Sequence, residues 1–486
     1  MPNQSVQSPG QSDTTTPNGG WTNAIVISFI AMILVQEFIA LSYTTVAIAT
    51  PEITVHFATT QAGWLLTGFL LVSAVVSPLF GKLADLHGKR RMLLIAMSIA
   101  LVGAVVSVTA QNMAMLIIGR CLEGAVGVGL FLTYSLMRDV YPPKVLPLAA
   151  SMSLTGSGIF GAFVPLMAGS LLDAYGFRGL FALDVVILAV LLVLVRLSTA
   201  ESDVRKPATL DIVGSLMIGA GLAMILVAIS KGADWGWASG RVIGLFVFGA
   251  VLAIGFVLRS RRVTEPLIDL RLFSRRPILM AAIAGALAYA GFTITSSIFP
   301  MIGQTPAGLG GDYGLGMTAT KYAALATPYA LSIVAGGIIV GKLVVHVGGR
   351  TLMVVGCLLV TLGGLSVSLF MVSYWQLAVG AVITGLGAGL VMGAVPNIVI
   401  AHTPAEDQGS ISSGVTTVTS MMTATAPIVM FAILNANATE IPGVYLKAGY
   451  SHAALLVAAL GGAAFVLLLT VFAKRRMTAP LAPTDS

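Results

Sequence analysis

Charged side chains are scarce in this sequence. Asp, Glu, Lys and Arg together make up only 9% of the 486 residues, whereas apolar residues make up 57% and the mean hydropathy is +0.96. A water-soluble domain of this length needs far more charge to cover its surface. The composition therefore argues against a soluble protein and predicts an all-α integral membrane protein.

Cysteine and histidine are also rare. The two cysteines, Cys121 and Cys357, both fall inside predicted spans, where they are expected to be small core residues rather than a disulfide or metal ligands. The five histidines lie mostly in predicted loops without metal-ligand spacing. No G-x-x-x-x-G-K-[ST] loop is present, so direct use of ATP is not expected. We therefore expect no enzymatic activity, no cofactor and no metal.

Long apolar runs are what the sequence has in abundance. We expect fourteen membrane-spanning helices. They lie at about 21–50, 61–80, 92–109, 114–136, 147–172, 179–195, 212–229, 242–258, 278–300, 321–345, 351–372, 375–400, 410–434 and 452–473. The net charge of +7 comes from basic residues between these runs, which indicates membrane topology rather than nucleic-acid binding.

A charged loop organises the first half of the chain and returns in the second. Gly81–Arg91 reads G-K-L-A-D-L-H-G-K-R-R between two predicted spans, and Gly341–Arg350 reads G-K-L-V-V-H-V-G-G-R about 260 residues later. A repeat in both hydropathy and motif indicates a chain built from two related halves. With this loop inside, 20 of the 26 Lys and Arg residues are cytoplasmic and 5 external, which places both termini in the cytoplasm.

The first loop resembles the signature G-x-L-A-D-x-x-G-x-[RK]-[RK] between helices 2 and 3 of the major facilitator superfamily. It departs from that pattern at Leu86, and the second copy has Val345 at the position of Asp85. The resemblance implies that the loop gates the cytoplasmic side, and its candidate gating residues are Gly81, Asp85, Gly88, Lys89 and Arg90. Asp85 is expected either to pair with the start of a helix near Gly409–Ser410 or to be a solvated loop carboxylate.

The resemblance implies two six-helix bundles joined by an inserted pair of helices, because a six-helix half needs only roughly 200 residues. The expected parts are a disordered cytoplasmic tail (1–20), an N-terminal bundle (21–196), a linker with two accessory helices (197–276), a C-terminal bundle (277–473) and a cytoplasmic tail (474–486). Asp211–Gly214 and Glu265–Pro277 also look like the fourteen-span drug/proton antiporters, so the resemblance covers most of residues 21–476.

The first span carries a second antiporter-like pattern. Leu41–Pro51 reads L-S-Y-T-T-V-A-I-A-T-P and resembles L-D-x-T-I-V-N-V-A-L-P, with Ser42 in place of the acid. Glu37 lies near the midpoint of this span but about 140° around the helix from Ser42. A carboxylate at this depth costs about 2.5–3.5 kcal/mol, so it normally faces a cavity or a partner. Glu37 is therefore either a proton or cation site or a packing residue hydrogen-bonded to neighbouring helices.

The fourth span contains an arginine and a glutamate on one helical face. Arg120 and Glu123 stand at positions i and i+3 of R-C-L-E-G, which resembles the superfamily pattern R-x-x-Q-G. Arginine stays charged in proteins, so a nearby carboxylate is expected to offset its burial. The pair is either a proton-coupling device or a static ion pair near the extracellular end.

The fifth span is rich in small residues. Its motif Gly161-x-x-x-Pro165-x-x-x-Gly169, together with Gly158, resembles the antiporter signature of helix 5, although Val164 replaces the usual glycine. The resemblance implies export, and close packing by small residues is the alternative. The thirteenth span carries many hydroxyl groups and two methionines that could line a cavity or bond to other helices. The substrate-cavity candidates are Glu37, Ser42, Thr416, Ser420 and Met421.

These features predict a proton-coupled secondary transporter that exports amphipathic small molecules by alternating access. Glu37, Glu123 and Arg120 are the candidate proton-coupling residues, and which carboxylate takes the proton stays open. The alternative function is export of an endogenous lipid or metabolite, with or without protons. The expected partners are membrane lipids, the substrate and protons. We expect a monomer in the plasma or inner membrane.

Overall fold

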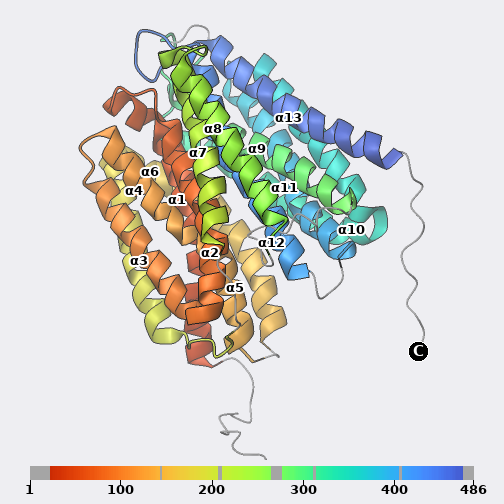
Figure 1. The fold of residues 1–486 in the computed structure, drawn as a ribbon. Coiled ribbons are helices and arrows are strands. Elements are labelled where there is room, and N and C mark those ends of the chain that lie inside the picture. Colours follow the sequence, from red (N-terminus) through yellow and green to blue (C-terminus); the bar gives the residue numbers. More distant parts are fainter. Residues whose placement is uncertain are drawn as a thin grey trace, which may run out of the picture.

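The computed structural model of the chain is helical throughout the segments it describes, apart from loops and one isolated bridge (Figure 1). These segments are residues 22–142, 145–205, 211–263, 276–309, 313–403 and 408–473. The first half contains α1 (Asn23–His56), α2 (Gly63–His87), α3 (Lys89–Val108), α4 (Met113–Glu123), the 3-10 helix η1 (Gly124–Val128), α5 (Gly129–Val140) and α6 (Leu146–Ser198). Next come α7 (Ile212–Trp235) and α8 (Gly240–Ser260). The second half contains α9 (Arg276–Gln304), α10 (Ala319–Leu369), α11 (Tyr374–Ala401), α12 (Gln408–Asn435) and α13 (Lys447–Ala473).

Most of these helices are long and apolar enough to cross a membrane. Within the described residues 11 helices meet that test, or 12 if the bent α2 counts as one span. Two helices are exceptionally long: α6 has 53 residues and α10 has 51. Each is interrupted by one non-helical glycine, Gly176 (φ 66°) and Gly348 (φ 79°), so each consists of two helical segments. The count of fourteen spans stays a prediction.

The apolar core is arranged in three large clusters. One lies in the N-terminal half and includes Met32, Leu93 and Leu188, and another lies in the C-terminal half and includes Met353 and Val391. The largest cluster contains residues of both halves, from α1, α2, α4 and α6 on one side and from α9, α10, α12 and α13 on the other. It occupies the end of the molecule that the predicted topology places outside. The two bundles therefore pack tightly against each other at that end.

Polar contacts between the halves occur at the same end. The Asp173 carboxylate accepts hydrogen bonds from the backbone N–H groups of Ala319 (3.0 Å) and Thr320 (2.9 Å), at the start of α10. Gln304 Nε2 donates to the carbonyl of Ile48, and Asn435 Nδ2 donates to the carbonyl of Thr60, each at 2.9 Å. These bonds link α6 to α10, α9 to α1, and α12 to the loop before α2. They join the two halves at the end that the predicted topology places outside.

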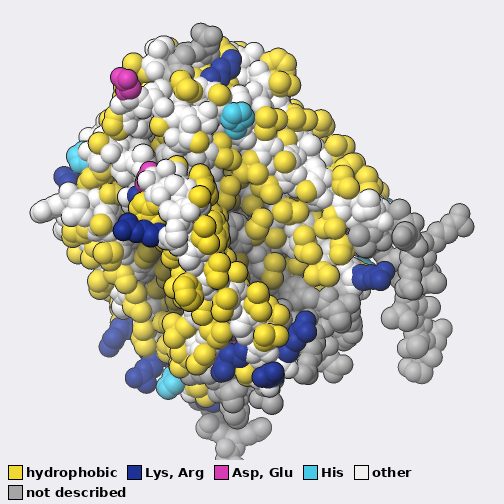
Figure 2. Space-filling view, turned by 45° about the horizontal axis from the view of Figure 1, so that its top comes forward, with side chains coloured by type: hydrophobic (Ala, Val, Ile, Leu, Met, Phe, Trp, Pro, Cys, Tyr) yellow, Lys and Arg dark blue, Asp and Glu magenta, His cyan; other side chains and the backbone are white. Residues whose placement is uncertain are grey.

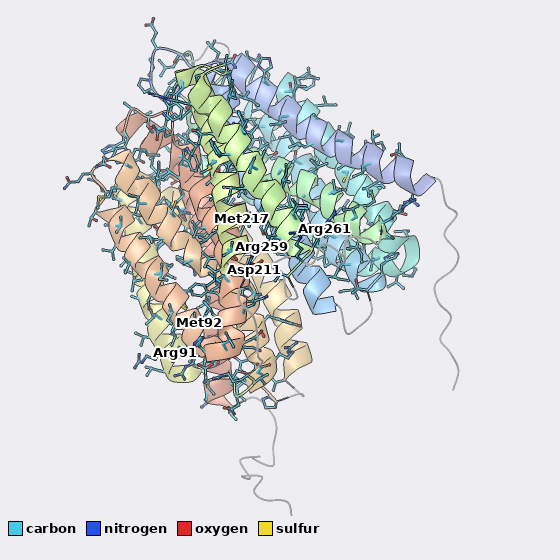
Figure 3. The ribbon with its side chains drawn as sticks, viewed as in Figure 1. Arg91, Met92, Asp211, Met217, Arg259 and Arg261 are labelled. Carbon is cyan, nitrogen blue, oxygen red and sulfur yellow. The ribbon has the colours of Figure 1, made fainter. Side chains whose placement is uncertain are left out.

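The accessory hairpin lies between the bundles rather than against one of them. Figure 1 shows α7 and α8 crossing in front of the boundary between the two halves. A small apolar cluster joins Leu71 of α2, Leu226 of α7 and Ile428 of α12. At the other end of the hairpin, Arg259 Nε lies 2.8 Å from Asp211 Oδ1, and Figure 3 shows the two residues together. Because α7 contacts one helix of each bundle, it spans their boundary.

The surface is mostly apolar with charge at its edges. Figure 2 shows hydrophobic side chains over most of the visible face, and many of the Lys and Arg side chains gather toward its lower part. Exposed large apolar residues are numerous on α8, including Val247, Phe248, Val251 and Ile254. Such a surface fits a lipid environment, where the apolar face of a helix needs no protein cover.

Candidate functional site

A buried charge cluster lies inside the N-terminal bundle. Arg120 and Glu123 of α4 are both 0% exposed and form an ion pair through Nη1 and Oε2. Arg120 Nη1 also donates to Ser42 Oγ of α1 at 2.8 Å, and its Nε donates to the carbonyl of Leu65 at 3.3 Å. The guanidinium stands 4.5 Å from the centre of the Phe69 ring, a cation–π contact. The structure thus brings together three sequence-predicted residues: Arg120, Glu123 and Ser42.

Glu123 is fully supplied with hydrogen-bond donors. Its Oε1 accepts from Ser107 Oγ of α3 at 2.5 Å, and its Oε2 accepts from Arg120 and, at 3.5 Å, from Ser42. Ser107 reaches Glu123 because α3 and α4 meet at glycines: a Cβ on Gly103 would lie 2.6 Å from the backbone nitrogen of Glu123. Small residues at this crossing let the two backbones approach closely. Donors of this kind favour the ionised form of a carboxylate.

A second carboxylate completes the cluster, and the sequence analysis did not single it out. Asp184 of α6 is 0% exposed and faces Glu123, Arg120 and Ser42. Both of its oxygens and Arg120 Nη2 are buried without a hydrogen-bond partner. Its signal in the sequence was that it is the only charged residue in the apolar run between Arg178 and Arg196. An acid inside a predicted span is a candidate functional residue by itself.

Tyr43 connects the cluster to the other bundle. It follows Ser42 on α1, lies within electrostatic reach of Arg120, and its hydroxyl is 3.5 Å from Ser297 Oγ of α9. Tyr329 of α10 faces Tyr43 and stacks on Phe292 with a centroid distance of 6.0 Å. Tyr43 therefore links the charge cluster to the aromatic and hydroxyl side chains at the boundary between the two halves.

The remaining cavity candidates are not brought to this cluster. Glu37 is 7% exposed on α1, and within the described segments it forms neither an ion pair nor a hydrogen bond with Arg120. Ser420 and Met421 are half-buried on α12, in the opposite bundle, and Thr416 is exposed. Their roles stay predictions.

The predicted gating loop is tied to its own bundle. Gly88 joins α2 to α3 with φ 110°, and a Cβ there would lie 2.8 Å from Cδ of Glu201. Glu201 belongs to the segment after α6, and its carboxylate lies against the N-terminal end of α3. There it accepts hydrogen bonds from the backbone N–H groups of Arg90 (2.8 Å) and Arg91 (2.9 Å). Figure 3 shows Arg91 at the lower end of this bundle. The segment after α6 therefore fixes the loop between α2 and α3 through these hydrogen bonds.

A buried ion pair also holds the loop between α2 and α3 in place. Lys89 Nζ lies 2.5 Å from Asp139 Oδ2 of α5, and Ser202 Oγ donates to the same oxygen at 2.6 Å. Arg90 Nη1 donates to the carbonyl of Thr199 at 2.6 Å. Asp139 was missed from the sequence because it follows Arg138 at a helix end, where a solvated acid is ordinary. Asp85 was expected to pair with the start of a helix near Gly409–Ser410. The side chains there lie outside the described residues, so this pairing stays a prediction.

The antiporter-like motif in α6 is described in part. Pro165 and Gly169 are buried, whereas the surroundings of Gly158 and Gly161 lie outside the described residues. Gly169 packs against the start of α10: a Cβ on it would lie 2.6 Å from the carbonyl oxygen of Ala319. The glycine thus permits close contact between the bundles at the closed end.

The described residues hold no group of three or more His, Cys, Asp or Glu side chains suited to a metal ion. A cavity of about 480 Å³ lies in the C-terminal half and is lined by the second copy of the loop at Gly348, Gly349 and Arg350, and by Asn397 and His402. The buried cluster of Arg120, Glu123 and Asp184 is the strongest candidate site for chemistry.

Comparison with known sequences gives consistent relatives. The chain is 27% identical over 370 residues to the probable actinorhodin transporter of Streptomyces coelicolor, covering 73% of this chain and 62% of that protein. It is 26% identical to multidrug resistance protein 3 of Bacillus subtilis (79% of this chain, 74% of that protein). It is 28% identical to the tetracenomycin C resistance and export protein of Streptomyces glaucescens (81% and 73%). The chain thus spans less than two thirds of the length of the actinorhodin relative.

Solved structures share the fold. A peptide transporter of the POT family in complex with sulfate superposes with a TM-score of 0.66 at 18% identity, covering 92% of this chain and 94% of that one. A bacterial homolog of the human lysosomal transporter Spinster, in an inward-facing conformation, gives 0.63 at 15% identity (95% and 100%). The family model described as Major Facilitator Superfamily matches residues 30–427 and 281–485. With its two helical bundles and its repeated glycine-rich loop, the chain belongs to the Major Facilitator Superfamily.

Proposed function

We propose that this protein is a proton-coupled secondary transporter that exports amphipathic small molecules from the cytoplasm or inner leaflet by alternating access. The observation that carries the proposal is the buried Arg120–Glu123 pair, linked through Ser42 and Tyr43 to the boundary between the bundles. The relatives named as drug and antibiotic transporters support an exporting direction. The proposal includes a monomer in the plasma membrane, with both termini in the cytoplasm.

The coupling follows from electrostatics. A carboxylate that takes up a proton loses most of its attraction for the guanidinium, so Arg120 and Ser42 change partners. Tyr43 is the next residue after Ser42 and touches Ser297 of the other bundle, so the change biases how the two halves meet. A proton bound from outside and a substrate bound from inside then favour different arrangements of the same two bundles.

An end closed on the proposed extracellular side corresponds to the state of this cycle that does not open to the outside. The bonds of Asp173, Gln304 and Asn435 across the halves must break for the external side to open. The bonds of Gln304 and Asn435 join neutral partners and contribute about 0.5–1.5 kcal/mol each, and those of the Asp173 carboxylate about 1.5–3 kcal/mol each, so their rupture is within reach of substrate and proton binding. The inserted α7 contacts both bundles and must adjust as they move.

The experiment uses purified protein in proteoliposomes with an imposed pH gradient, following ethidium and a neutral lipophilic dye. Gradient-driven movement by the wild type that is lost in Glu123→Gln supports the proposal, and Glu37→Gln tests the other predicted carboxylate. Asp234→Asn is the matched control, because Asp234 is half exposed and pairs with the neighbouring Lys231 at the end of α7. Wild-type movement that ignores the gradient would overturn proton coupling.

Export of an endogenous lipid or metabolite is a second candidate, favoured by Ser42. The antiporter-like pattern has an acid at this position, but here the hydroxyl binds the cation Arg120. The α1 position that holds an acid in the antiporter-like pattern therefore offers no fixed anion to a cationic drug. A neutral or anionic aromatic substrate fits it better. Faster transport of the neutral dye than of ethidium would favour this candidate.

A further inference from the structure

The charge cluster contains two carboxylates and a single arginine. Arg120, Glu123 and Asp184 are each 0% exposed, so with all three ionised the site would carry one uncompensated negative charge away from water. An uncompensated buried charge is costly enough that a protein normally neutralises it by binding a proton. We propose that Asp184 is the proton-binding residue of this transporter and shares one proton with Glu123 around Arg120, an inference that rests on the proposed function.

Hydrogen bonding decides which carboxylate holds the proton. Glu123 accepts from Ser107, Arg120 and Ser42, so all of its donors support the ionised form. The Ser42 hydroxyl is near enough to Asp184 to influence it, but neither Asp184 oxygen meets a donor at hydrogen-bond distance. A protonated Asp184 gains an O–H donor, and the Ser42 hydroxyl and the Glu123 carboxylate, which both face it, are acceptors. The proton therefore resides on Asp184 in this arrangement.

The guanidinium of Arg120 is the group that changes partners. Its Nη2 is buried without a hydrogen-bond partner, while its Nη1 is held by Glu123 and Ser42, and the charge of Arg120 acts on Asp184. When the proton leaves the Asp184 oxygen, the carboxylate that remains competes with Glu123 for the guanidinium. Arg120 then bridges α4 and α6, and Ser42 loses its share of Nη1. The O–H of Asp184 is the one covalent bond that breaks: its proton leaves to water on the cytoplasmic side, and a new proton binds the same carboxylate from the external side.

Few other titratable groups surround the cluster. Within the described residues Asp184 interacts with the charges of Glu123 and Arg120 alone. From the packed helices, α4 adds Cys121 and α1 adds Tyr43, and both face Arg120. Glu37 lies five residues before Ser42, about 1.4 turns along α1 and on another face of it, and α3 carries no titratable side chain after Arg91. α5 and α10, which also contact α6, place no charged side chain on Asp184.

The test reads the proton directly. Infrared difference spectra of the purified protein between low and high pH report the carbonyl stretch of a buried protonated carboxyl group. We expect one such band in the wild type, shifted when aspartate is labelled with ¹³C at its side-chain carboxyl and unshifted when glutamate is labelled. Asp184→Asn removes the band, and Asp234→Asn keeps it. Glu123→Gln also removes it, because Arg120 then neutralises Asp184 alone. A band that follows glutamate labelling, one that survives in Asp184→Asn, or none in the wild type overturns the inference.

Transport separates this inference from the proposed function. In proteoliposomes Asp184→Asn is expected to lose at least ten-fold of gradient-driven accumulation while it keeps exchange of labelled for unlabelled substrate without a gradient. Asp184→Glu is expected to restore part of the accumulation, which shows that a titratable group, rather than shape, is needed. Gradient-driven transport that is intact in Asp184→Asn overturns the inference and leaves proton coupling standing. Wild-type transport that ignores the gradient refutes the proposed function, and the infrared band still decides where the proton binds.

Discussion

The carboxylate of Asp173, in the N-terminal bundle, caps the first turn of α10 in the other bundle through the backbone N–H of Ala319 at 3.0 Å. The bond crosses the molecule where the two halves close. The first N–H groups of a helix have no partner within the helix, and the helix dipole favours a negative charge there. Asp173 thus links one half to the other through the backbone of α10, and the side chains of Thr318 and Thr320 add to the contact.

We expect Asp173→Ala to favour the state that is open to the outside. Loss of a capping carboxylate costs about 0.5–2 kcal/mol, which shifts the population about 2- to 30-fold. Asp173→Asn keeps one acceptor oxygen and should shift it less. Labelling of an introduced Ala323→Cys by a membrane-impermeant thiol reagent measures the opening, because Ala323 is buried near Gly169 in the closed end. Equal labelling in Asp173→Ala and in its parent would contradict this role.

We expect Gly169→Ala to weaken the contact between α6 and α10. The added methyl group would lie 2.6 Å from the carbonyl oxygen of Ala319, so the two helices must separate. Overpacking of this kind costs about 1–3 kcal/mol. Gly240→Ala is the matched control, because nothing lies within 4 Å of its added Cβ. Thermal unfolding in detergent should show a lower midpoint for the first variant only.

We expect Lys89→Met to destabilise the protein by about 3–5 kcal/mol, because it leaves the buried Asp139 carboxylate without its cation. Asp139→Leu in the same chain removes the stranded charge, so the double variant should recover most of the loss. The two single variants and the double variant form a cycle that isolates the pair. Thermal midpoints of the variants measure the interaction between the two side chains. If the loss in the double variant equals the sum of the losses in the single variants, the ion pair contributes nothing.

We expect Tyr43→Phe to lower the transport rate about 2- to 10-fold, because the variant removes one hydrogen bond between the bundles while it keeps the ring. Tyr134→Phe is the control, because Tyr134 is 54% exposed on α5. Initial rates and the thermal midpoint are measured together. An unchanged rate in Tyr43→Phe would show that the contact with Ser297 does not transmit the coupling.

The sequence by itself determined the local features. Apolar length predicts the membrane helices, the repeated loop predicts two related halves, and the spacing of Arg120 and Glu123 predicts that they share a helical face. These inferences hold because they depend on neighbours within one helix, whose geometry is fixed at 3.6 residues per turn.

Only the tertiary structure decided which helices face one another. Asp184 lies about 60 residues from Glu123 in the chain, and its place beside Arg120 depends on how α6 packs on α1 and α3. Asp139 beside Lys89 and α7 between the bundles were undetermined for the same reason. In a membrane, helices associate by close packing of small residues and a few polar bonds rather than by burying apolar faces from water. Hydrophobicity therefore fixes that a helix spans the membrane and leaves its partners to the shape of the whole assembly.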